Sequence, residues 1–196
     1  KIGIKLYINY MRRSEPSVRS IYSMIKSGDY GSEWHGSIFY SKGFLHNASH
    51  FHNLFSHIFG PVVSKRKLFT YKNLKERDKI ISAKICYEKG IIYFIPTPIS
   101  DTSHLFFDIL SESHRISYQN GGREVRLTFL KGKHQKKKNM FSIKSKKIQS
   151  DFNRFQIHVL NDIQKLFEGK KSFLCSGQED LNSLIQIRSL LDDKKN

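Results

Sequence analysis

Apolar and polar residues alternate strictly over residues 2–8, so that the apolar side chains fall on one face. This pattern predicts a half-buried strand. A turn at residues 14–17 follows, and apolar residues then recur at helical spacing until Gly28. We predict a helix that begins at Pro16 or Ser17 and ends at that glycine.

Residues 29–43 are rich in Gly and Ser and contain the single tryptophan, Trp34. We expect an ordered loop here. Residues 44–59 again carry apolar side chains at helical spacing, and Gly60-Pro61 follows them. A second amphipathic helix is therefore predicted, ended by this Gly-Pro pair.

The middle of the chain is rich in strand patterns. Residues 80–87 and 91–95 flank a short turn and predict a hairpin. Residues 105–110 are apolar and fit a strand or a helix. A second hairpin is predicted around Asn120-Gly121-Gly122, because the positive backbone dihedrals of a tight turn suit Asn and Gly.

The hydrophobic period changes to a helical one near the C-terminus. One helix is predicted over residues 152–167, capped by Ser150 or Asp151, and a second begins near Ser176. The expected fold is α+β, with a mainly antiparallel sheet packed by N-terminal helices and a C-terminal helical hairpin. The expected domains are a core at residues 1–130, a basic loop or linker at 131–148 and the hairpin at 149–196.

Charge adds the clearest functional signal. The chain holds 34 Lys and Arg against 17 Asp and Glu, a formal net charge of +17. Such an excess favours a polyanionic partner, either nucleic acid or an anionic membrane. The residues expected to bind it lie in two basic runs: Lys65, Arg66 and Lys67; and Lys131, Lys133, Lys136, Lys137, Lys138, Lys144, Lys146 and Lys147.

Trp34 admits two interpretations. On an exposed Gly-rich loop it would stack on a base or anchor in a membrane interface, whereas a lone tryptophan more often anchors a local core. The two cysteines, Cys86 and Cys175, lie among apolar neighbours and indicate a reducing, intracellular compartment. No apolar stretch approaches the length of a membrane-spanning helix, so we expect a soluble protein.

Motifs of catalysis are missing from the sequence. It contains no P-loop, no dinucleotide-binding glycine motif and no G-x-S-x-G. Asp101, Asp108 and Glu112 with Lys84 offer only a generic nuclease-like set. His46, His50, His52 and His57 lack the further ligands of a zinc or iron motif. We therefore expect a non-enzymatic protein with no cofactor and no metal.

Three segments resemble the matrix proteins of rhabdoviruses: the opening strand and helix through Arg13-Ser14-Glu15-Pro16 and Trp34, the segment Cys86 to Pro96, and the hairpin at residues 118–122. The resemblance implies a structural protein that self-associates, condenses a ribonucleoprotein and attaches it to an anionic membrane. The lysine run and the C-terminal helices depart from it.

The function expected from the sequence is thus non-catalytic binding of a polyanion, RNA or a ribonucleoprotein, with a viral matrix protein as its most concrete form. The alternative is an RNA-binding ribosomal protein from an A/T-rich organellar genome, because Ala, Pro and Val are scarce beside Lys, Ile and Phe. The corresponding locations are the virion or host cytoplasm, and an organellar ribosome.

Overall fold

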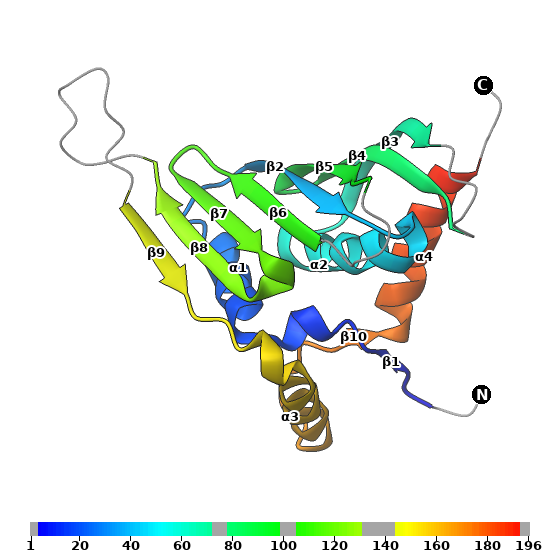
Figure 1. Ribbon diagram of the computed structural model, residues 1–196. Helices are drawn as coiled ribbons and strands as arrows, with labels where there is room; N and C mark the ends of the chain where they lie inside the picture. The colour runs from blue at the N-terminus through cyan, green and yellow to red at the C-terminus, as the bar shows by residue number, and fades with distance from the viewer. Residues whose placement is uncertain (1–3, 72–77, 99–104, 131–143, 193–196) are drawn as a thin grey trace.

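The computed structural model describes residues 4–71, 78–98, 105–130 and 144–192. Its main feature is an eight-stranded sheet in the order β3-β4-β5-β2-β6-β7-β8-β9 (Figure 1). The strands are β2 (Trp34–Tyr40), β3 (Val62–Tyr71), β4 (Ile80–Tyr87), β5 (Gly90–Pro96), β6 (Leu105–Leu110), β7 (His114–Gln119), β8 (Glu124–Phe129) and β9 (Lys144–Ile148).

The sheet is mixed. Strand β2 lies at its centre, where it pairs parallel with β5 and antiparallel with β6. All other neighbours in this sheet pair antiparallel. The predicted α+β class is confirmed. The parallel pair was not predicted, and it is possible because the connection from β2 to β5 is a long crossover that contains α2, β3 and β4.

Helices cover one face of the sheet. They are α1 (Pro16–Ser27), α2 (Ser49–Phe59) and α4 (Gly177–Leu191), and α2 contacts both of the others (Figure 1). Short helical turns η1 (Met11–Ser14) and η2 (Phe44–Ala48) precede α1 and α2. Burial alternates along β4, as expected for a sheet with one covered face.

Aromatic side chains dominate the core between α2 and the sheet. Phe51 and Phe55 of α2 meet Phe107 of β6, whose ring stacks on Tyr118 of β7 with a centroid distance of 4.6 Å. All four side chains are completely buried. Large buried rings contribute both apolar area and specific edge-to-face geometry, which fixes the position of α2 on the sheet.

The predicted helix after residue 16 is confirmed. The Glu15 carboxylate caps it by accepting hydrogen bonds from the backbone N–H groups of Ser17 and Val18, and Gly28 ends it in the left-handed region. The second helix, both hairpins and a strand at residues 105–110 are also present. The segment at 120–122 forms the short turn η3 (Asn120–Gly122) between β7 and β8.

The prediction of a loop over residues 29–43 was wrong, because this segment contains the central strand β2. Gly36 is one of the glycines that led to the loop prediction, but it has a different role. A Cβ at this position would collide with the backbone oxygen of Asp108 and lie 2.8 Å from the Cα of Ile109. The glycine thus permits the close approach of β6 rather than a turn.

The predicted N-terminal strand is shorter and more exposed than expected. Strand β1 (Tyr7–Ile8) forms a two-stranded pair with β10 (Cys175–Ser176). Ile4 and Leu6 are 79% and 63% exposed. Residues 1–3 lie outside the described part of the chain. The apolar side of this segment is therefore not covered by the residues that the structure describes.

The two C-terminal helices follow the predicted boundaries but pack on different elements. Helix α3 (Phe155–Phe167), preceded by the turn η4 (Phe152–Arg154), packs mainly against η1, whereas α4 packs mainly against α2. Figure 1 shows α3 projecting away from the sheet. Strand β9 falls within the predicted linker and extends the sheet. The division into domains stays a prediction.

Among the described helices, none is long and apolar enough to cross a membrane.

Candidate functional site on the outer face of α2

Helix α2 has two polar sides of chemical interest beyond its aromatic inner face. His50, Asn53 and His57 recur at intervals of three or four residues and therefore share one side of the helix. This side faces η1 and α4. A surface helix normally shows such groups to water, so their partial or complete burial here marks the face as a candidate site.

Local sequence explains the position of α2. Gly43 adopts a positive φ of 72° and leads into η2, a π-helical turn that runs directly into the helix. Gly60, at a φ of 92°, ends the helix and is followed by Pro61. Both ends are thereby fixed, and the polar side chains point away from the sheet on a rigid element.

His50 lies on the first turn of α2, next to η1. Its ring meets the ring of Tyr10 edge to face, with centroids 5.2 Å apart. Burial, and to a lesser extent the nearby Arg12 cation, lowers the pKa of His50 to about 4. The Nδ1 atom is buried and has no hydrogen-bond partner among the described residues. His50 is thus a neutral imidazole with one free ring nitrogen.

Tyr10 links this end of α2 to α4. Its hydroxyl donates a 2.6 Å hydrogen bond to Asp180 Oδ1. Burial raises the pKa of Tyr10, and the hydrogen bond to the Asp180 carboxylate raises it further. The phenol therefore stays protonated, holds its ring in place and keeps the edge of that ring against His50.

Arg12 fills a structural position beside this pair. The guanidinium lies over the rings of Phe51 and Phe152, at 5.1 and 5.3 Å from their centroids. It is 6% exposed. The quadrupoles of the two aromatic rings attract the guanidinium cation that lies between them. Arg12 therefore joins η1 to α2 and to η4.

Arg13 occupies the other end of the α2 face. Its Nη2 lies 2.5 Å from His57 Nδ1 and donates a 2.9 Å hydrogen bond to Glu179 Oε1 of α4. Tyr22 stacks on the His57 ring at a centroid distance of 4.6 Å. Burial and the Arg13 cation lower the pKa of His57 to about 3. This histidine is consequently neutral.

The other buried histidine, His52, has a structural role. Its Nδ1 lies 3.0 Å from the Tyr87 hydroxyl and its Nε2 lies 3.2 Å from Gln186 Oε1. The amide oxygen can only accept, so Nε2 carries the proton and Nδ1 accepts from the phenol. Burial lowers the pKa of His52 to about 4. Both ring nitrogens are used in joining α2 to β4 and α4.

The four histidines of this region do not converge on a common point. Across the described ranges, no group of three His, Cys, Asp or Glu side chains is placed to hold a metal ion. His52 and His57 each spend at least one ring nitrogen on a hydrogen bond to a neighbour. A metal centre therefore has no ligand set in this part of the molecule.

The predicted polyanion-binding residues are divided between two strands. Lys65, Arg66 and Lys67 are on β3, whereas Lys144, Lys146 and Lys147 are on β9, and these strands form the two opposite edges of the sheet. At the usual strand spacing the two groups are roughly 30 Å apart. They do not form one patch. Lys131, Lys133, Lys136, Lys137 and Lys138 lie outside the described residues.

Two further sequence-based sites are not assembled. Trp34 is completely buried in β2, so its indole cannot reach a base or a membrane. In the nuclease-like set, Asp108 accepts hydrogen bonds from Arg115 Nε and from the Ser117 hydroxyl. Lys84 lies on β4, which β5 and β2 separate from β6. Asp101 lies outside the described residues.

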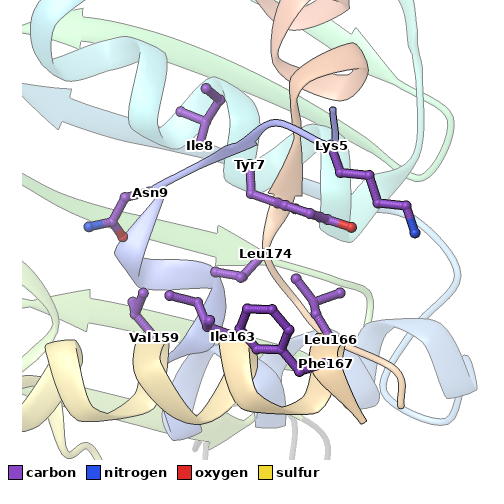
Figure 2. Close-up of a pocket in the computed structure, with 9 residues that line it drawn as sticks. All are labelled: Lys5, Tyr7, Ile8, Asn9, Val159, Ile163, Leu166, Phe167 and Leu174. Atoms are coloured by element: carbon purple, nitrogen blue, oxygen red, sulfur yellow. The ribbon is translucent and has the colours of Figure 1, made fainter. Parts of the chain in front are cut away.

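An apolar groove forms a second feature, below β1. Figure 2 shows Tyr7 on one side and Ile163, Leu166 and Phe167 of α3 on the other, with Leu174 between them. Its volume is about 570 Å³. Phe167 is 88% exposed. The exposed Ile4 and Leu6 line a neighbouring groove, together with Gly177 and Leu181.

The sequence analysis missed the arginine pair and the exposed groove. Arg12 was not considered, and Arg13 entered only as part of the segment Arg13-Ser14-Glu15-Pro16 of the resemblance. Two adjacent arginines just before a helix that is capped by Glu15 could have drawn attention to this site. The histidines were expected to be rim contacts of a helix. His50 and His57 are instead partly buried against η1.

Comparison with known proteins identifies the fold. No protein-family model and no curated protein matches the sequence. Solved structures do match. A putative NADPH-dependent oxidoreductase from Desulfitobacterium hafniense is 9% identical, with a TM-score of 0.75 over 96% of this chain and 62% of its own.

Two more structures agree. UDP-N-acetylglucosamine 3-dehydrogenase from Acidithiobacillus ferrooxidans is 10% identical, with a TM-score of 0.74 over 95% of this chain and 61% of its own. An oxidoreductase from Agrobacterium radiobacter, solved in complex with NAD+, L-tartaric acid and magnesium, is 13% identical, with a TM-score of 0.68 over 97% and 64%.

This likeness corrects the expectations drawn from the sequence. The resemblance to rhabdovirus matrix proteins was wrong, because the solved structures that match nearly the whole chain are oxidoreductases and dehydrogenases. The same matches contradict the other functional expectations. These are the matrix and ribosomal functions, the non-enzymatic class, and RNA or a membrane as partner. The chain has the fold of about three fifths of each of these proteins.

Proposed function

We propose that this chain is the sheet domain of a nicotinamide-dependent oxidoreductase that acts on a secondary alcohol of a small polyhydroxylated substrate. The observation that carries the proposal is the match of nearly the whole chain to oxidoreductases, of which it spans only about three fifths. The remaining part of such a protein would hold the cofactor.

The described residues do not fit a dinucleotide. A pyrophosphate group prefers a glycine-rich turn at a helix N-terminus, where free N–H groups point at it. The sequence lacks that glycine motif. The Glu15 carboxylate already occupies the N-terminus of α1, and Glu179 and Asp180 lie in the first turn of α4. Negative charge at both positions would repel a pyrophosphate.

The apolar groove and residues 4–8 supply a surface for a nucleotide-binding domain. Ile4, Leu6 and Phe167 are largely exposed, together with Leu181 and Ile185 of α4. Phe167 lines the groove described above, whereas Ile4, Leu6 and Leu181 line a neighbouring groove that shares Lys5 and Tyr7 with it. Exposed apolar side chains around adjoining grooves are typical of an interface. We assign this surface to a nucleotide-binding domain because the chain spans only about three fifths of each matching oxidoreductase.

His50 is the side chain that we assign to the substrate. Tyr10 lies directly after Ile8 and Asn9, which line the groove, so the Tyr10–His50 pair lies beside the proposed domain boundary. Oxidation of an alcohol requires an acceptor for the hydroxyl proton. The neutral His50 ring, with its unpartnered Nδ1, is suited to accept a hydrogen bond from that hydroxyl.

The test uses the complete reading frame that contains these 196 residues. The expressed protein is titrated with NADH and NADPH, with nicotinamide fluorescence as the readout, and assayed with sugars, nucleotide sugars and hydroxy acids. We expect binding of one dinucleotide and turnover of at least one alcohol. Failure to bind either dinucleotide would overturn the proposal.

His50 is tested in the same protein. We expect His50→Ala to lower kcat by about 10²-fold or more while dinucleotide affinity is unchanged. His35→Ala is the matched control, because His35 is exposed on β2 and bonds only to the neighbouring Glu33 in the described structure. Unchanged turnover of His50→Ala would remove His50 from the site.

A further inference from the structure

A small cavity of about 250 Å³ lies between η1, α2 and α4, two helical turns along α2 from His50. It is lined by Arg13, Asn53, Ser56, His57, Pro61, Glu179, Asn182, Ser183 and Gln186. All of these lining residues except Pro61 are polar. The cavity is separate from the apolar groove, since the two share no lining residue.

Unpartnered polar atoms gather around this cavity. Six buried atoms of its lining residues have no hydrogen-bond partner within the described structure: Arg13 Nε and Nη1, Asn53 Oδ1, Ser56 Oγ, His57 Nε2 and Ser183 Oγ. Arg13, Asn53 and Ser183 are at most 5% exposed. Folded proteins leave few buried polar groups unsatisfied, so such a cluster in one cavity indicates an occupant.

The neighbouring contacts fix which of these atoms donate. A guanidinium can only donate, so His57 Nδ1 accepts from Arg13, and the proton of the neutral ring lies on Nε2. Arg13 uses Nη2 for His57 and Glu179, which leaves Nε and Nη1 as donors. The hydroxyls of Ser56 and Ser183 add two more donors.

The single unpartnered acceptor is Asn53 Oδ1. The orientation of this amide follows from Cys175: its thiol lies 3.5 Å from the Ser176 carbonyl, to which it donates, so its sulfur accepts from Asn53 Nδ2 at 3.2 Å. Asn53 therefore presents its oxygen. Glu179 is engaged at both oxygens: Oε1 accepts from Arg13, and Oε2 accepts from the backbone N–H and the hydroxyl of Ser176.

We propose that this cavity binds a small hydroxycarboxylic acid. The carboxylate would accept from the donors of Arg13, His57 and the two serines, and the hydroxyl would donate to Asn53 Oδ1. A single negative charge suits the site, because Glu179 already balances part of the Arg13 charge. The volume admits a few non-hydrogen atoms rather than a larger ligand.

Calorimetry with L-lactate tests the proposal in the purified chain, without any dinucleotide. Binding is measured in parallel with acetate, which lacks the hydroxyl, and with inorganic phosphate. We expect saturable binding of lactate, weaker binding of acetate and the weakest binding of phosphate. Because no cofactor takes part, this result is independent of the dehydrogenase proposal.

Ser183→Ala gives the sharper test. The Ser183 hydroxyl makes no hydrogen bond in the described structure, so its removal breaks no contact of the fold. We expect lactate to bind about tenfold more weakly or worse, with an unchanged or raised melting temperature. Ser189→Ala is the control on the same helix, where the hydroxyl is exposed and bonds to the Gln186 carbonyl. Absence of lactate binding, or equal affinity in Ser183→Ala, would overturn the proposal and leave the cavity to water.

Discussion

Arg19 of α1 and Asp162 of α3 form an ion pair across the base of the molecule. The Nη2 atom of Arg19 lies 2.6 Å from Asp162 Oδ2, and the Asp162 side chain is completely buried. Lys165, one turn further along α3, also reaches this carboxylate, at 3.2 Å. The pair ties the projecting helix α3 to the helices that cover the sheet.

Arg19→Met should therefore destabilise the protein strongly. It leaves the buried Asp162 carboxylate with only the Lys165 ammonium, and loss of one partner of a buried pair costs about 3 kcal/mol. Urea unfolding measures the change. Arg154→Met is the control, since the Arg154–Asp151 pair is solvent-exposed and we expect its loss to change stability little. Equal losses in the two variants would contradict the assignment.

Stability should fall as the pH drops from about 6.5 to about 4. The pKa of His52 is near 6.5 in the unfolded chain and about 4 in the folded protein, so in this window the unfolded state binds the proton more readily. His52 alone changes the free energy of unfolding by about 1.4 kcal/mol per pH unit in the middle of the window. His50 and His57 act in the same direction.

Unfolding in urea across this pH range checks the sign. His52→Gln should flatten the profile, whereas His35→Gln should not, because His35 is exposed on β2. The pKa of His57 is also affected by the nearby charges of Arg13, Lys26, Lys171 and Glu179. These charges change only the contribution of His57 to the pH dependence of stability. A profile that rises as the pH falls would contradict the burial of neutral imidazoles.

Gly36→Ala should disrupt the centre of the sheet. A methyl group there would collide with the Asp108 backbone oxygen, which cannot move without separating β2 from β6. We expect a loss of about 2 kcal/mol or more in the free energy of unfolding. Ser37→Ala, at the next position and on the other face, should change stability by about 0.5 kcal/mol or less. Thermal and urea unfolding give both values.

Phe167→Ser should leave folding intact and change association. The ring is 88% exposed, so its replacement should alter stability by no more than about 0.5 kcal/mol. A dye that fluoresces on apolar surfaces should bind less well to the variant. In the complete reading frame, the same change should weaken contact with the nucleotide-binding domain. Unchanged dye binding would show that the groove is not the accessible apolar site.

Local sequence predicted most of the elements but not their arrangement. The helix from Pro16 to Gly28, the turn at 120–122 and the start of a helix near Ser176 depend on neighbouring residues, and all are present. Strand β2 was missed because Gly36 is required by a strand more than 70 residues away. Strand β3 was missed because its basic residues show no alternation of apolar and polar positions.

The candidate site was harder to predict for the same reason. Arg13, His57 and Glu179 come from three separate segments, and only the fold shows that they meet. The positive charge of the sequence led to a different prediction, because the most basic described runs are Lys65–Lys67 and Lys144–Lys147. Their place on the sheet edges gives them another physical role: charged edge strands discourage pairing with a second copy of the sheet.

The central place of β2 has a consequence for how the chain reaches its fold. Its two partners, β5 and β6, follow it by roughly 50 to 70 residues, whereas β4-β5 and β6-β7-β8 are connected by short turns. Local hairpins close faster than contacts between distant segments. During synthesis at the ribosome, β2 with its tryptophan can therefore be paired on both sides only after β6 has emerged. Two preformed meanders then close around it, and this late step completes the hydrophobic core.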